Sequence, residues 1–233
     1  MSNKKVSFIP TSIDAEKFVQ PPQPARQYSP EWIKRMPAFK DNRLSVDLSG
    51  QANLTAKMCM PFMDTFSFGY IQETWCDIFI ERDNLGNPNY YYSNFPHIIS
   101  SRDSDNKPQD DGFYSTEFVW KVQWSPKLPK GYSALYTHPL NRDDLPFRSM
   151  SGIVDADKHF FESTGNHPFF IKKDFEGVIP KGTPMYQIIP FKRDDWSSDV
   201  AEFDPELDKQ RHSLRSKFWG VYKTNYWTKK TFK

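Results

Sequence analysis

Hydrophobic and polar residues alternate through the middle of the chain in short runs, each ended by turn residues. A repeat of two residues is typical of a β-strand with one buried face. The clearest case is E-F-V-W-K-V-Q-W at 117–124, which predicts a strand lining the core with four side chains on one face: Phe118, Trp120, Val122 and Trp124. Other strand runs start near Leu44 and become dense after Lys57, with M-C-M-P-F-M at 58–63 and G-Y-I-Q-E-T-W-C-D-I-F-I at 69–80.

The two ends of the chain follow other patterns. Residues 1–45 are interrupted by prolines, which indicates an extended arm with one helical turn after Pro30, capped by Ser29. Residues 46–195 form the predicted β core. In residues 196–233, Asp204 and Pro205 predict the start of a helix, followed by a basic and aromatic tail. An apolar stripe at helical spacing marks this last segment: Leu207, Leu214, Phe218 and Val221.

These patterns predict a mainly β protein: a single β-clip or sandwich-like barrel domain with an extended N-terminal arm and a C-terminal helix. A length of 233 residues suits one large domain of this kind. Aromatic residues make up 16% of the chain, so the core should consist of rings more than of aliphatic side chains. The aromatic arm should wrap either its own domain or a neighbouring subunit.

Charge and cysteine content narrow the function. The net charge is +2, so no global field attracts the chain to nucleic acid or to a membrane surface. Cys59 and Cys76 each lie in an apolar run, which predicts buried free thiols. No signal-peptide pattern or apolar run of membrane-spanning length is present, so we expect a protein of the host cytoplasm or a virion and no membrane contact.

The segment S-G-I-V-D-A-D at 151–157 is the first candidate for chemistry. Asp155 and Asp157 follow a short strand and share one face of it. Two such carboxylates can bind a cation, position a water or accept hydrogen bonds from a sugar. They can equally end the strand in a turn whose backbone amides they satisfy. Both interpretations stay open at this point.

The second candidate follows the predicted strand Y-S-A-L-Y. His138, Asn141 and Arg142 place an imidazole, an amide and a guanidinium within five residues. Arginine suits an anionic ligand because its planar fork makes two parallel bonds. Alternatively, Arg142 forms an ion pair inside the protein, with Asp143, Asp144 or the two acids at 155 and 157.

Metal and nucleic-acid binding are weaker alternatives. His138, Asp155, Asp157, His159 and His167 lie within thirty residues, yet no pair of histidines has a tight ligand spacing, and we expect no metal and no other cofactor. The tail mixes lysines with aromatic rings, which can mark a nucleic-acid surface. In a nearly neutral chain we expect instead packing with exposed lysine ends, or a subunit contact. The residues concerned are Lys217, Phe218, Trp219, Tyr222, Lys223, Tyr226, Trp227, Lys229, Lys230 and Lys233.

Several segments in order resemble an uncharacterised family of T4-like phages of marine bacteria and of some bacteria. The resemblance covers residues 55 to 196 and includes P-K-G-Y-S-A-L-Y-T-H-P-L-N-R, S-G-I-V-D-A-D and P-K-G-T-P-M-Y-Q-I-I-P-F-K-R. It implies a phage context and no particular reaction.

A second resemblance is to dUTP pyrophosphatases and related trimeric β-clip enzymes. Their order of P-x-G-Y, G-V-I-D-x-D-Y and G-x-x-x-x-Q is similar to residues 129–132, 152–157 and 182–187. It implies that Asp155 matches a water-activating carboxylate and Gln187 a strand glutamine near the site. The chain departs from the pattern at Lys158, where the family has a stacking tyrosine, and it lacks the P-R-S-G segment and the Gly-rich arginine tail.

We therefore expect a phage-encoded, non-enzymatic binding or structural protein, such as a virion or assembly component. Its arm and tail should contact a second copy of the chain or other phage proteins. The alternative is a small-ligand or nucleotide-binding enzyme with the dUTP pyrophosphatase-like fold. Its ligand would lie between His138, Arg142, Asp155 and Gln187.

Overall fold

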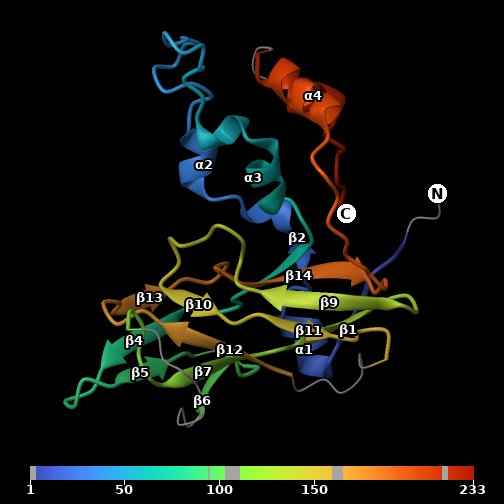
Figure 1. Ribbon diagram of the computed structural model, residues 1–233. Coiled ribbons are helices and arrows are strands. Elements are labelled where there is room, and N and C mark those ends of the chain that lie inside the picture. The colour runs from blue at the N-terminus through green and yellow to red at the C-terminus, as the bar shows by residue number, and fades with distance from the viewer. Residues whose placement is uncertain (1–3, 94, 103–110, 159–164, 217–219) are drawn as a thin grey trace. The chain divides into compact units, whose positions relative to one another are not determined.

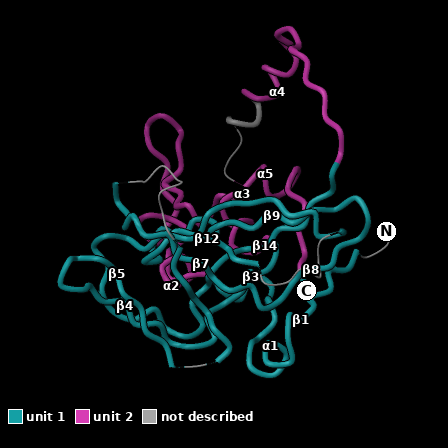
Figure 2. Tube along the Cα trace, turned by 90° about the horizontal axis from the view of Figure 1, so that it is seen from below, with its two compact units in different colours: residues 1–28, 69–193, 233 teal, residues 29–68, 194–232 magenta. Residues whose placement is uncertain are grey.

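The computed structural model describes residues 4–93, 95–102, 111–158, 165–216 and 220–233 (Figure 1). Contacts divide the chain into two compact units (Figure 2). The β unit consists of residues 1–28, 69–193 and 233, and the helical unit consists of residues 29–68 and 194–232. The second unit therefore combines a part of the predicted arm, the start of the predicted core and the C-terminal segment.

Antiparallel sheets form the β unit. The largest has the strand order β11 (Gly152–Val154), β9 (Tyr132–Thr137), β14 (Pro184–Lys192), β3 (Tyr70–Glu73) and β2 (Gln23–Pro24). The second has the order β10 (Phe147–Ser149), β12 (Asn166–Ile171), β7 (Glu117–Lys121) and β6 (Ile99–Arg102). The third has the order β13 (Gly177–Ile179), β4 (Ile78–Arg82) and β5 (Pro88–Tyr91), and β1 (Ser7–Pro10) pairs with β8 (Trp124–Lys127). The predicted mainly β fold with a C-terminal helix is confirmed.

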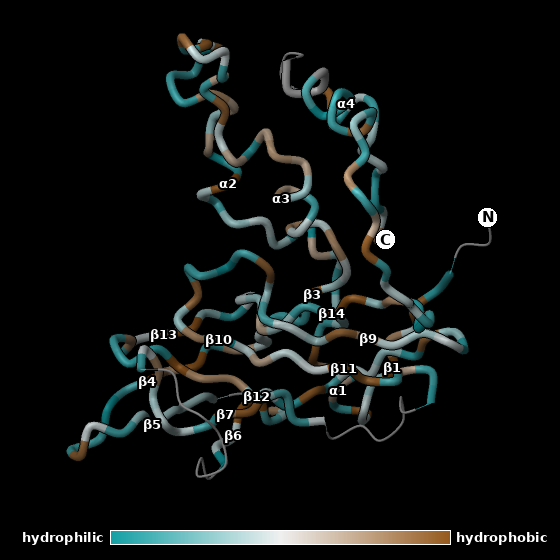
Figure 3. Tube along the Cα trace, viewed as in Figure 1, coloured by the Kyte–Doolittle hydropathy of each residue, from teal (hydrophilic) through white to brown (hydrophobic). Residues whose placement is uncertain are grey.

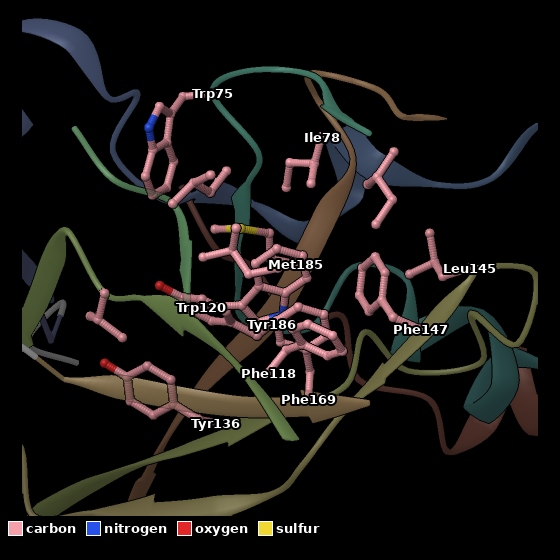
Figure 4. Close-up of a cluster of buried hydrophobic side chains, with 14 of the residues drawn as sticks. Trp75, Ile78, Phe118, Trp120, Tyr136, Leu145, Phe147, Phe169, Met185 and Tyr186 are labelled. Carbon is pink, nitrogen blue, oxygen red and sulfur yellow. The ribbon is translucent and has the colours of Figure 1, made fainter. Parts of the chain in front are cut away.

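Aromatic rings from several strands fill the core of the β unit (Figure 4). The Trp120 ring of β7 stacks on that of Phe169 of β12, with centroids 3.7 Å apart. The predicted alternation along 117–124 is only partly right. Val119 is buried as fully as Phe118, because β7 lies between β6 and β12 with both faces covered, and Trp124 belongs to the next strand.

The first part of the predicted arm wraps its own unit. β1 pairs with β8, and β2 pairs with β3. Between them lie helix α1 (Ile13–Phe18) and Val19, whose carbonyl accepts a hydrogen bond from the Trp124 indole at 3.0 Å. A short 3₁₀ helix, η1 (Ala25–Tyr28), closes this segment. The chain re-enters at Gly69, where φ is +79° and a Cβ would lie 2.3 Å from the Ile188 carbonyl oxygen, so only glycine fits.

The helical unit contains short helices: α2 (Glu31–Arg35), η2 (Ala56–Met58), α3 (Met60–Thr65), α4 (Pro205–Ser216) and α5 (Val221–Asn225). The predicted turn after Pro30 is α2, although Pro30 itself, not Ser29, is the N-cap residue. The strand prediction for the run M-C-M-P-F-M is wrong: the run ends η2 and begins α3, because Pro61 suits the first turn of a helix. Asp204 caps α4 as predicted, accepting a hydrogen bond from the Glu206 backbone at 2.8 Å.

Two further sequence predictions need correction. The apolar stripe expected in one C-terminal helix does not stay on it, because α4 ends at Ser216 and Val221 starts α5; Phe218 and the Leu214 side chain lie outside the described residues. Cys76 is buried as predicted, but Cys59 is exposed, since it precedes α3 outside the aromatic core. Among the described helices, none has the length and apolar character needed to cross a membrane.

Candidate functional site

A cavity of about 330 Å³ opens among β8, β9, β11 and the start of β12. The S-G-I-V-D-A-D segment contributes one wall, through Gly152, Val154 and Ala156. Tyr136 of β9 and His167 of β12 also line it. A mostly apolar cavity of this size with a few polar side chains is typical of a small-molecule site.

His167 lines the cavity together with the S-G-I-V-D-A-D segment. It is only 7% exposed, and its ring centroid lies 4.9 Å from that of Tyr186 and 5.7 Å from that of Tyr136. Burial lowers the pKa of His167 to about 4, so the imidazole is neutral at neutral pH. Its Nε2 atom has no hydrogen-bond partner among the residues that the structure describes. An unmet buried group costs about 1–3 kcal/mol, which a bound hydrogen-bond donor would recover.

Asp155 and Asp157 lie past the end of β11, where Arg193 holds both of them. Arg193 Nη2 donates to Asp157 Oδ2 at 2.5 Å, and Nη1 donates to Asp155 Oδ1 at 3.0 Å. Asp157 also accepts from the Gly131 backbone at 2.8 Å, and Asp155 from the Ser133 hydroxyl at 2.7 Å. The Arg193 guanidinium lowers the pKa of Asp157 to about 2, and the Ser133 hydroxyl lowers that of Asp155. Both acids are ionised and engaged, which does not suit general acid–base chemistry near neutral pH.

The turn after β9 holds the other predicted residues through hydrogen bonds to backbone groups. His138 Nε2 lies 3.0 Å from the Arg142 carbonyl oxygen, and its Nδ1 accepts from the Ser149 backbone at 3.3 Å. Burial lowers the pKa of His138, so the ring is neutral and both nitrogens are occupied. Gln187, buried in β14, accepts a hydrogen bond from the Leu140 backbone at 2.9 Å. These contacts fix the shape of the turn.

Arg142 forms an ion pair inside the protein. Its guanidinium donates to both carboxylate oxygens of Asp144, at 2.8 and 2.9 Å, and to the Tyr28 carbonyl oxygen at 3.0 Å. Asn141 is exposed and has a φ of 58°, a left-handed conformation that asparagine tolerates better than most residues. The guanidinium fork is thus occupied by a neighbouring carboxylate.

The structure does not bring all of the predicted site residues together. β11 and β9 are antiparallel, with Val154 opposite Ala134, so Asp155 lies near the start of β9. His138 follows the end of the same strand. Six residues of strand separate the two places by roughly 20 Å. The expected pocket shared by His138, Arg142, Asp155 and Gln187 is therefore wrong: His138, Arg142 and Gln187 form one cluster and the twin acids another.

The predicted site omitted two residues that matter in the structure: Arg193, which binds the twin acids, and His167, which lines the cavity. Arg193 reaches the acids because β14 runs antiparallel to β9, with Lys192 opposite Tyr132. The signal available in the sequence was a strand that ends in K-R just after P-M-Y-Q-I-I-P-F. His167 lies in the strand run N-H-P-F-F-I, and only the pairing of β12 determines which side chains it meets.

Metal binding finds no support in the described part of the chain. No group of three or more histidine, cysteine, aspartate and glutamate side chains in it could hold a metal ion. His159, which was weighed with the others, lies outside the described residues. In the tail, Lys230 and Trp227 both contact Asp64, at 2.6 Å and 3.0 Å, so part of the basic and aromatic tail packs within the helical unit.

No family model matches the chain, and no curated protein matches it. Three solved structures are similar over part of it. Two are dUTPases from phage phi11 of S. aureus, one of them a point mutant, with 16% and 15% identity over 47% and 46% of this chain and 99% and 97% of theirs. The third is a mutant dUTPase of Staphylococcus bacteriophage 80alpha, with 15% identity over 47% of this chain and 89% of that one. Each has a TM-score of 0.25, and a match at this level says nothing about a site or a reaction.

Proposed function

We propose that the chain is a phage-encoded, non-enzymatic binding or structural protein, a component of a virion or of its assembly, that joins other subunits through its C-terminal segment. The observation that carries this proposal is the segment Asp194–Asp204. It has no regular secondary structure, and it presents three large apolar side chains, Trp196, Val200 and Phe203, that are 90%, 100% and 74% exposed.

Such exposure is unfavourable in a monomer. Burying a large apolar side chain stabilises a protein by about 1.5–3 kcal/mol, so three exposed side chains in one segment are typical of a contact surface. Acids interrupt these residues or flank them closely, and they keep the segment soluble before it binds. There are five: Asp194, Asp195, Asp199, Glu202 and Asp204. The resemblance of residues 55 to 196 to T4-like phage sequences supports the phage context.

The polar clusters agree with a role that needs no catalysis. Arg193 engages both acids after β11, and Asp144 engages Arg142. These are ion pairs that fix the ends of strands. They leave neither a carboxylate near its ordinary pKa nor an unoccupied guanidinium at the residues that the sequence suggested for chemistry.

The experiment compares the solution mass of the full chain with that of a variant carrying Trp196→Ser, Val200→Ser and Phe203→Ser. We expect the wild type to form oligomers at concentrations on the order of 100 μM and the variant to form smaller species than the wild type, because the apolar contacts of this segment are lost. A matched control replaces three exposed apolar residues elsewhere in the helical unit, Leu44, Val46 and Leu48, by serine. A wild type that stays monomeric, and is absent from purified particles, would contradict the proposal.

The cavity beside S-G-I-V-D-A-D favours a second candidate function, the binding of a small, mostly apolar ligand or a nucleotide. We expect a ligand to raise the melting temperature, because binding to the native state stabilises it. A thermal-shift screen with nucleotides and divalent metals tests this. Gly152→Leu should abolish the shift, since Gly152 lines the cavity and a Cβ there meets nothing within 4 Å.

Gly112→Leu is the control for this screen, because a Cβ at Gly112 also meets nothing within 4 Å and Gly112 does not line the cavity. A shift that survives Gly152→Leu places the ligand elsewhere. The absence of any shift removes this second candidate and leaves the first untouched.

A further inference from the structure

The third sheet of the β unit carries an apolar row on its outer face. β13 directs Ile179 into the core, β4 directs Ile78 and Ile80, and Tyr90 of β5 packs against the same core. The residues between them alternate to the other face, where Val178, Phe79 and Tyr91 are 42%, 49% and 52% exposed. The register places Val178 opposite Phe79, and Phe79 opposite Tyr91. The three side chains are therefore direct neighbours in a line across all three strands.

A groove continues this row beyond β13. It has a volume of about 370 Å³ and is lined by Val178 together with Leu145, Pro146, Phe175 and Pro180. The turn between β4 and β5 carries another exposed apolar side chain, Leu85, but Glu81 and Asn89 form the polar cross-strand pair nearer to it, so it stands apart from the row. Figure 3 shows hydrophobic colour at the tip of this hairpin. We call the row and the groove together the apolar band.

The apolar band is large enough to form the centre of a standard interface. Two aromatic rings that are each half exposed offer roughly 200 Å² together, and Val178 and the groove residues extend this area. A standard interface takes about 800 Å² from each partner, of which about 57% is apolar, or roughly 450 Å². Scattered single hydrophobic residues are normal on a surface, but adjacent apolar side chains that border a groove are typical of a contact.

Charges around the apolar band indicate what kind of partner it fits. Arg82 pairs with Glu176 at 2.9 Å, and the Tyr91 hydroxyl bonds Glu81. In the groove, Lys172 lies in the same lining as Asp174. Both signs are thus present along the rim, whereas a polyanion or an acidic peptide would require a basic one. A second copy of the same face, related by a two-fold axis, can oppose unlike charges.

We propose that two copies of the chain associate through this face, with the row Val178, Phe79 and Tyr91 of one copy packed against the same row of the other. The contact is isologous and joins β units. It is separate from the contacts of the C-terminal segment and does not depend on them.

The test uses the full chain with Trp196, Val200 and Phe203 replaced by serine, so that association through the C-terminal segment cannot contribute. Sedimentation velocity over a concentration series should show a monomer–dimer equilibrium. Phe79→Lys should raise the dissociation constant at least tenfold, because a desolvated charge replaces a central aromatic contact. Ile153→Lys, at a 67% exposed site on β11, is the matched control and should leave the constant unchanged.

Tyr91→Lys provides a second variant if Phe79→Lys lowers the melting temperature. A monomer at all concentrations in the parent chain overturns this proposal while leaving the proposed function standing. A dimer that both lysine variants retain overturns it as well, since the contact must then lie elsewhere. A dimer lost equally in Ile153→Lys would assign the effect to added charge and also contradict the proposal.

Discussion

Arg193 decides what the twin acids can do. Arg193 bonds both oxygens of Asp157, one of which also accepts from the Gly131 backbone, and Asp155 Oδ1 accepts from Arg193 and from the Ser133 hydroxyl. The guanidinium itself cannot exchange a proton near neutral pH, because it stays protonated. Arg193, which was not among the predicted site residues, thus links the end of β14 to the twin acids after β11 and to the start of β9.

This ion pair predicts how stability responds to acid. The pKa of Asp157 in the folded protein is about 2, below its ordinary value. Ionised Asp157 therefore contributes fully to the free energy of unfolding above about pH 4, and this contribution is lost as the pH falls towards 2. In Arg193→Met the pKa of Asp157 in the folded protein should rise towards its value in the unfolded chain. We therefore expect the variant to be less stable at pH 7 and to lose less additional stability between pH 4 and 2.

Urea midpoints measured at several pH values check this expectation. Arg211→Met is the control, because it removes the same charge from an exposed position on α4. Parallel acid profiles for the wild type and Arg193→Met would mean that Asp157 gains nothing from the guanidinium in the folded protein.

At the scale of elements, some local signals in the sequence identify a structure, whereas the pairing of distant strands has no such signal. Asp204 and Pro205 predicted the start of α4, since a cap depends only on adjacent residues. The turn D-N-L-G-N between β4 and β5 is also built from local contacts, because the Asp83 carboxylate accepts backbone hydrogen bonds from Leu85 and Asn87. Both features lie within a few residues of sequence.

The prediction of one shared pocket is wrong for a geometric reason. His138 follows the end of β9, and Asp155 follows the end of β11. The ends of parallel neighbours meet at one edge of a sheet, but the ends of antiparallel neighbours lie at opposite edges. Without the strand order, no pattern in the sequence distinguishes the two cases. The pairing that brings His167 towards β11 is likewise set by contacts between distant segments.

At the scale of the whole molecule, the two units differ in how much core they hold. The β unit contains the aromatic cluster. In the described part of the helical unit, the buried hydrophobic side chains are Ile33 and Phe66. Regions with few buried contacts open at lower free energy than packed cores. We expect calorimetry to resolve two transitions, with the helical unit unfolding first.

Asp64→Ala tests this order, because Asp64 accepts hydrogen bonds from Trp227 and Lys230 within the helical unit. Losing bonds to a charged group costs about 1.5–3 kcal/mol. The first transition should therefore shift to lower temperature while the second, which reports the β unit, stays in place. Arg43→Ala, at an exposed site of the same unit, should move neither. A single transition that shifts as a whole in Asp64→Ala would mean that the two units unfold as one, and that the tail stabilises the entire chain through Asp64.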